Sequence, residues 1–311
     1  MKKLLGSLVL AVCCVSAWAV DLAVPEELVG NQTIGIVHVH LKAFKFDQIG
    51  KTLTDKLGEA PDPKAIAEVK DFVDKFKAAG GQGVSIIINA DKNANAANAS
   101  DGIVFLVTKG EDADNEKLAA LFNGPMAAAK DKMAPGCPKE IGSALVWHSA
   151  KYKLAKKGNE ERAQAFSEAY SHLSKDASVS VVIVPDEDAV ALAEASLKDA
   201  KPEEAAMMKA LLGATGFCLF TDFGVAAEPA LKVLVLAADA DGAVVLDKSA
   251  KGLIGILKTE APPPLQSVLK SLQTVQAGSN VQLSIDIGDL VKAVKAMAEA
   301  FAPGAEPPKD K

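Results

Sequence analysis

The sequence predicts an α+β protein built from two tandem copies of one β-α-β-β-α-β module, each with an antiparallel sheet and a trailing helix. Two observations support this class. Strand-like and helix-like segments follow one order in the first half of the chain, and the same order recurs in the second half, roughly 125 to 145 residues later. The expected architecture is the ferredoxin-like plait, or split βαβ, with helices on one face of each sheet.

In the first half, apolar runs predict the strands, and apolar residues at three- and four-residue steps predict the helices. The clearest helix spans residues 63–81, where Val69, Val73 and Phe76 share one face and Gly80 ends the pattern. The predicted segments are a strand at 34–41, helices at 41–57 and 63–81, strands at 82–90 and 101–110, a helix at 115–122, a strand at 140–149 and a helix at 161–173.

The second half repeats this order. Its predicted segments are a strand at 178–185, helices at 186–200 and 202–214, strands at 216–224 and 230–238, helices at 242–258 and 265–273, a strand at 281–287 and a helix at 289–301. We therefore assign residues 20–176 to a first α+β module, residues 177–302 to a second, and residues 303–311 to a disordered tail. A single large sheet to which both halves contribute strands is the alternative.

Several predicted strands are apolar on both faces, as in Ile103 to Val107 and Leu231 to Ala237. Such strands are normally covered on both sides. A helical layer on one face leaves the other to contact the second module, another copy of the chain, or an apolar ligand or partner. We expect packing between the two modules, with a protein partner or self-association through a sheet face as the alternatives.

The first 19 residues have the order of a secretory signal peptide: two lysines, a short apolar run and small residues that end at Ala19. We expect an exported protein, periplasmic or extracellular. Cys13 and Cys14 raise the alternative of a lipid anchor, but neither follows the small residue that acylation prefers. No other segment approaches the 20 or so apolar residues of a membrane span, so we expect no transmembrane segment in the mature chain.

Charge and cysteine content narrow the function classes. Removing the leader, with its two lysines, would change the net charge from −6 to −8, which disfavours nucleic acid as a partner. Arg162 is the only arginine, and phosphate recognition usually relies on arginine forks. Cys137 and Cys218 are predicted to be unpaired thiols, with a disulfide between them as the alternative.

His38 and His40 are the strongest chemical candidates. Their alternate spacing places both side chains on one face of a strand, and pairs of this kind occur in zinc sites. His148 is the natural third ligand, but a plait would put it near Ile34, roughly 13 to 20 Å away. Aligning VHVHLKAF with LSIDIGDL pairs the two histidines with Ser284 and Asp286, which a polar strand face explains without a metal.

The remaining motifs are weaker. Residues 91–102 resemble a calcium loop that lacks its glycine and closing glutamate, and residues 49–52 resemble a phosphate loop that lacks its first glycine. We interpret GGQG at 80–83 as a helix end, Ser267 to Lys270 as one turn of an amphipathic helix, and Asp186 to Asp188 as a helix start.

The sequence therefore predicts no catalytic residue, no cofactor and no metal, and it indicates an exported, non-catalytic binding or interaction protein. A metal-assisted hydrolase that uses His38 and His40, or a structural component of the cell envelope, is the alternative. The dipeptide Trp147-His148 is the surface patch that we would mutate first.

Overall fold

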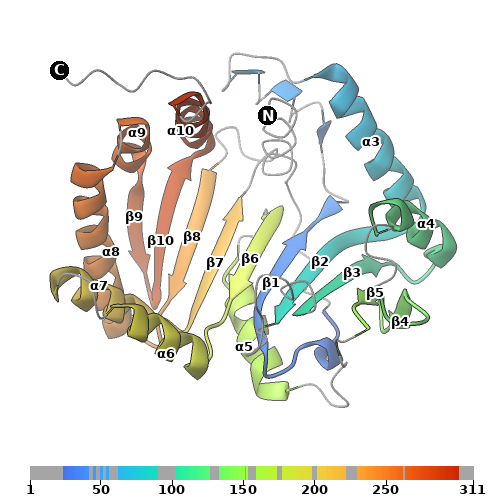
Figure 1. Ribbon diagram of the computed structural model, residues 1–311, viewed down its shortest axis with the longest axis horizontal. Helices are drawn as coiled ribbons and strands as arrows, with labels where there is room; N and C mark the ends of the chain where they lie inside the picture. The colour runs from blue at the N-terminus through green and yellow to red at the C-terminus, as the bar shows by residue number, and fades with distance from the viewer. Residues whose placement is uncertain are drawn as a thin grey trace.

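The fold is α+β and is built on one ten-stranded antiparallel sheet (Figure 1). The computed structural model describes residues 24–41, 45–46, 50–51, 54–55, 62–89, 102–126, 133–150, 152, 159–173, 177–197, 202–221, 230–261 and 263–300. The strands are β1 (Thr33–Val39), β2 (Gly81–Asn89), β3 (Ile103–Lys109), β4 (Lys139–Ile141), β5 (Ala144–His148), β6 (Val179–Ile183), β7 (Gly216–Thr221), β8 (Ala230–Leu236), β9 (Gln273–Ala277) and β10 (Asn280–Asp286).

Helices connect most of these strands. They are η1 (Glu26–Leu28), α3 (Pro63–Ala78), α4 (Asn115–Met126), α5 (Glu160–Ser171), α6 (Glu187–Ser196), α7 (Pro202–Leu212), α8 (Ala240–Glu260), α9 (Pro263–Ser271) and α10 (Ile287–Ala300). None of the helices in the described part of the chain combines the length and apolar character needed to cross a membrane.

The strand order in the sheet is β4-β5-β3-β2-β1-β6-β7-β8-β10-β9. The pair β1 and β6 lies at the centre and joins the two halves of the chain. From that pair to either edge the order is the same: three strands in sequence, then a hairpin whose second strand lies inside its first. All the neighbouring strands are antiparallel.

The sheet does not have the predicted ferredoxin-like topology. In a split βαβ unit, the strands before and after the first helix are parallel, and another strand lies between them. Here β1 and β2 flank α3 and are adjacent and antiparallel, with Val37 opposite Ile86. A helix between two strands is long enough to connect parallel strands or adjacent antiparallel strands. The order of helices and strands in the sequence therefore did not decide the topology. The continuous sheet is the alternative that the sequence had left open.

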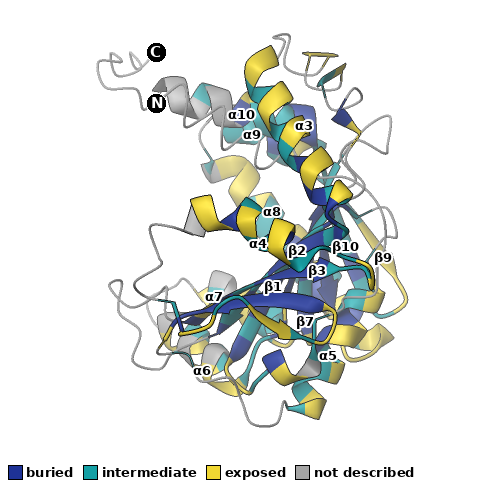
Figure 2. Ribbon diagram, turned by 90° about the vertical axis from the view of Figure 1, so that its right-hand side faces the viewer, coloured by how far each residue is buried: buried dark blue, intermediate teal, exposed yellow. Residues whose placement is uncertain are grey.

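Helices lie on both faces of the sheet, not on one as predicted. One face carries α3 and α4 over the first half and α7 and α8 over the second. The opposite face carries α5 and η1. Figure 2 shows α4 and α8 on one side of the strands and α5 on the other. The two faces are therefore both covered, in part, from within the chain.

The largest core cluster lies beneath α5 and spans both halves of the chain. Ile36 and Ile87 come from the first half and Val182 and Cys218 from the second, and Phe166 of α5 is buried with them. Cys218 and Cys137 are free thiols, as predicted. A core shared in this way makes α5 a structural element of both halves, although it is connected to the first.

Local signals in the sequence explain most of the element boundaries. Asp62 caps α3 by accepting a hydrogen bond from the Lys64 backbone N–H (2.9 Å), and Gly80 follows the helix with φ +84°. The strand predicted at 140–149 is instead the hairpin β4-β5, because Gly142 turns the chain with φ +54°. The predicted helix at 41–57 lies largely outside the described residues.

Candidate functional site

His38 and His40 lie at the centre of the sheet, on and just after β1, and face α5. Both are buried, with 5% and 3% of their surface exposed. As predicted, they share a face, and their ring centroids are 6.0 Å apart. The strand face is polar, and its two imidazoles are enclosed between the sheet and the helix.

Hydroxyl groups from three elements surround His38. Its Nδ1 lies 2.7 Å from Ser85 Oγ on β2, and its backbone pairs with Ser180 on β6. The ring of Tyr170 on α5 lies edge-on, 6.3 Å from the His38 ring, and its hydroxyl accepts a hydrogen bond from Ser180 Oγ at 3.2 Å. Gly83 leaves room for the imidazole, since a Cβ there would lie 2.8 Å from His38 Cε1.

This environment keeps His38 neutral. Burial, and secondarily the neighbouring His40, lower the pKa of His38 to about 4. Its Nε2 is buried and has no hydrogen-bond partner among the described residues. Neutral imidazole is the form that binds metals, so protonation does not decide whether this pair is a metal site; the geometry of a third ligand does.

His148, the candidate third ligand, lies three strands away from His38. It pairs with Val104 on β3, which pairs with Ile87 on β2 and through it with Ile36 on β1. Three strand spacings amount to about 14 Å. The predicted distance between His148 and the two histidines is of the right size. The predicted reason for it is wrong, because β5 lies three strands from β1 and not beside it. Among the described residues, no three histidine, cysteine, aspartate or glutamate side chains lie close enough to hold a metal ion.

The Trp147-His148 patch is also corrected, because both residues are buried, at 3% and 4% exposure. The Trp147 ring packs against the rings of Phe105 (5.5 Å) and Phe122 (5.9 Å), beneath α4. His148 faces the opposite side of the sheet, where its Nδ1 lies 3.0 Å from the Ser149 carbonyl. These residues form core and not a surface for ligands.

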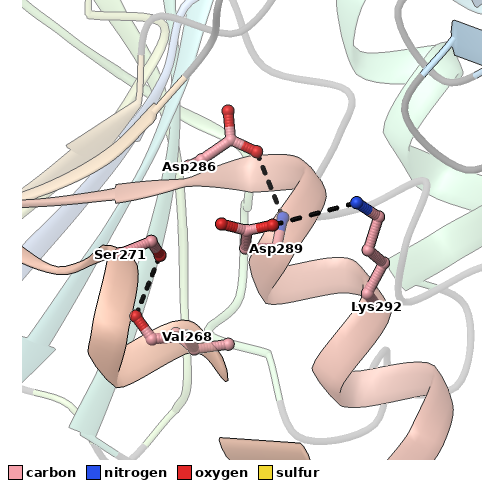
Figure 3. Close-up of polar contacts among 5 residues, drawn as sticks. All are labelled: Val268, Ser271, Asp286, Asp289 and Lys292. Carbon is pink, nitrogen blue, oxygen red and sulfur yellow. Dashed lines mark hydrogen bonds and ion pairs between the residues drawn. The ribbon is translucent and has the colours of Figure 1, made fainter. Parts of the chain in front are cut away.

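The alignment of the two histidines with Ser284 and Asp286 compares strands that are not equivalent in the sheet. The position of β1 corresponds to that of β6, whereas β10 corresponds to β5. Asp286 ends β10, and its carboxylate accepts a hydrogen bond from the Asp289 N–H (3.1 Å) in the first turn of α10, as Figure 3 shows. Asp289 also forms an ion pair with Lys292 (3.8 Å). Asp286 is thus a helix-capping residue.

Nearby, the side chain of Ser271 donates to the Val268 carbonyl (2.9 Å) at the end of α9 (Figure 3). The segment from Ser267 to Lys270 is helical, as predicted, with Val268 buried and Lys270 exposed. The acidic run at Asp186 opens α6, also as predicted. The calcium-like loop from residue 91 to 101 and half of the phosphate-loop-like segment lie outside the described residues, as do the leader and the tail.

Arg162 has a role that sequence analysis did not foresee. From the first turn of α5 its guanidinium donates to the carbonyls of Thr33 (2.9 and 2.6 Å), Pro185 (3.3 Å) and Val184. Thr33 begins β1, and Val184 and Pro185 follow β6, so the arginine binds the two central strands together. Burial lowers its pKa, and the nearby Asp186 carboxylate opposes that effect.

The surface most suited to binding is on the other face of the same central strands. We call it the central strip and define it as Val37, Val181, Ile183, Leu219 and Val233. Cross-strand pairing places four of these side chains in one row over β1, β6, β7 and β8. Ile183 and Leu219 are 44% and 37% exposed, and the other three residues are half-buried. Every member is aliphatic.

The described helices on this face lie mainly over the outer strands, so Ile183 and Leu219 are exposed, whereas Val233 also packs against the cluster beneath α8. Phe76 and Phe122, from α3 and α4, pack on β2, β3 and β5, and Leu246 of α8 packs on β8 and β10. Figure 1 shows the central strands between these two groups of helices. Exposed aliphatic side chains in the middle of a sheet are unusual and mark a contact surface.

Comparison of the chain with known protein families, with curated proteins and with solved structures finds no significant match. The assignment of a function therefore depends on the residues of the site. The sequence contains one signal that points to the strip, namely the apolar residues on both faces of the predicted strands. The sequence does not indicate where the helices pack, and their positions determine that the central strands are exposed.

Proposed function

We propose that the protein is an exported, non-catalytic interaction protein that binds an amphipathic helix of a partner protein along the central strip. The observation that carries the proposal is the exposure of Ile183 and Leu219 at the centre of the sheet. A soluble monomer gains by covering such side chains, and burial of a leucine or isoleucine side chain contributes about 2 kcal/mol.

The dimensions of the strip favour a helix as the occupant. Val37 on β1 and the exposed Leu219 on β7 are two strand spacings apart, about 10 Å. An α-helix with its side chains is about 10 Å in diameter. A single helix therefore matches this width and would lie in the same layer as α3 and α8, and its apolar face would contact side chains that carry no charge.

Three further features support an exported interaction protein. The first 19 residues have the composition of a cleaved leader. The repeated strand order supports an origin by duplication of one unit, whose two copies meet at β1 and β6. The burial of His38 and His40 beneath α5 disfavours the hydrolase alternative, because a substrate would have no direct access to a metal held by these two side chains. The central strip is therefore a better candidate for the binding surface than the two buried histidines.

Site-specific photocrosslinking tests this function. A benzophenone amino acid replaces Leu219 in the strip or, as a matched control, Val245, an exposed valine on α8 (54% exposed). After illumination in the exported fraction of the source cells, we expect a covalent protein adduct at position 219 and none at 245. Mass spectrometry should locate the adduct on a segment with apolar residues at three- and four-residue steps.

The substitution Ile183→Lys should reduce that adduct at least tenfold, because it places a charge beneath the apolar face of the helix. An unchanged circular dichroism spectrum would show that the fold is retained. An adduct to lipid, equal labelling at both positions, or no adduct at position 219 would contradict the proposal.

A further inference from the structure

The two edges of the sheet differ in a way that bears on assembly. β4 forms one edge with three residues, includes Lys139 and Glu140, and follows Pro138. β9 forms the other edge with five residues, QTVQA, none of which is charged or proline. Short length, charge and proline protect an edge strand from pairing with other chains. β9 has none of these protective features.

Backbone pairing shows which groups of β9 are available. The Ala237 N–H donates to the Ser279 carbonyl (2.9 Å), so the odd-numbered residues of β10 bond to β8 and the even-numbered ones bond to β9. In β9 the partners of those even-numbered residues are Gln273, Val275 and Ala277. The backbone N–H and C=O groups of Thr274 and Gln276 therefore point away from the sheet.

The exposed edge is self-complementary. If a second copy pairs antiparallel with β9 about a twofold axis at Val275, Thr274 of each chain lies opposite Gln276 of the other. These two residues carry the outward-pointing groups, so the pairing forms four backbone hydrogen bonds. The two Val275 side chains, each 56% exposed in one chain, then lie opposite each other in the closely spaced position.

Exposed apolar side chains flank this edge of the sheet on both faces. α8 packs beside β9 at this edge of the molecule (Figure 1). Of the eight exposed large apolar side chains among the described residues, four belong to these two elements: Val244, Val245, Leu257 and Val275. Val275 projects from the face of the sheet opposite α8, because its pair Gln282 lies between Val281 and Leu283 of the α8 cluster, so the α8 valines stand outside the strand pairing.

We propose that the protein forms a homodimer in which two β9 strands pair antiparallel about Val275 and join the two sheets into one. The occupant of the edge is thus a second copy of this chain. The interface is closed and isologous, so it terminates at the dimer. The proposal is independent of the central strip, which lies at the other end of the second half of the sheet.

Charge substitutions at the twofold axis test the pairing directly. Val275→Lys and Val275→Glu each place like charges opposite one another, so we expect each variant alone to raise the dimer dissociation constant at least tenfold in analytical ultracentrifugation. An equimolar mixture of the two variants should recover the dimer, because lysine then faces glutamate. Val244→Lys, on exposed α8, is the control for added charge, and its effect should be smaller than that of Val275→Lys.

A second variant tests the backbone. Gln276→Pro removes an outward N–H and leaves the bonds between β9 and β10 in place, so it should give a folded monomer. A protein that is monomeric at every concentration would overturn the proposal. So would a dimer that persists in Val275→Lys and Gln276→Pro, or two charge variants that fail to recover the dimer when mixed.

Discussion

At the scale of single residues, the chemistry of His38 follows from its enclosure. The imidazole lies between the sheet and α5, with Ser85, Tyr170 and His40 as its neighbours. None of these neighbours carries a negative charge that would stabilise an imidazolium. The alternation in IGIVHVHL predicted the shared face of His38 and His40, but their burial depends on α5, which is about 120 residues away in the sequence.

We predict that His38 makes the fold sensitive to acid. The pKa of His38 is about 4 in the folded chain, against 6.5 for an ordinary histidine, so the unfolded chain binds more protons between these values. The free energy of unfolding should therefore fall as the pH drops from about 6.5 to about 4, by about 3 kcal/mol in total. Urea unfolding at a series of pH values measures this slope.

His38→Gln should remove this component of the slope, whereas His172→Gln, at an exposed position after α5, should leave it unchanged. If the His38 variant keeps the acid dependence of the parent protein, another group is responsible and the account of His38 is wrong.

At the scale of elements, the sequence predicted the positions of helices and strands better than it predicted which strands pair with one another. Gly80 marked the end of α3 correctly, and most strands lie where apolar runs predicted them. β9 was missed because QTVQA has a single large apolar residue and no apolar alternation. The order of the strands was also wrong, since a helix between two strands leaves open whether they become neighbours. Position in the sheet depends on contacts between segments distant in sequence.

The connection of α5 to the central strands gives a prediction at this scale. Arg162→Gln removes donors to the carbonyls of Thr33, Val184 and Pro185 and leaves them partly desolvated, so we expect the free energy of unfolding to fall by about 3 kcal/mol. Arg162→Lys should recover only part of this loss, because one ammonium group cannot reproduce the planar fork.

Denaturant unfolding measures both Arg162 variants. Lys75→Gln is the control, because Lys75 forms an exposed ion pair with Asp71 within α3 (2.6 Å), which is worth less than about 1 kcal/mol. Equal losses in the Arg162→Gln and Lys75→Gln variants would contradict a special role for the arginine at the centre of the sheet.

At the scale of the whole molecule, we predict that the two halves unfold together. β1 and β6 pair along five residues, and the core beneath α5 contains Ile36 and Ile87 from one half and Val182 and Cys218 from the other. Neither half can open without exposing the apolar residues of the other. Calorimetry should therefore give one transition whose van't Hoff and calorimetric enthalpies agree.

Residues 20–176 expressed alone should lack a cooperative transition, because β1 would become an exposed apolar edge and Phe166 of α5 would lose its contacts with the second half. Two resolved transitions, or a cooperatively folded fragment, would mean that the halves are autonomous and that their shared sheet is only an association of domains.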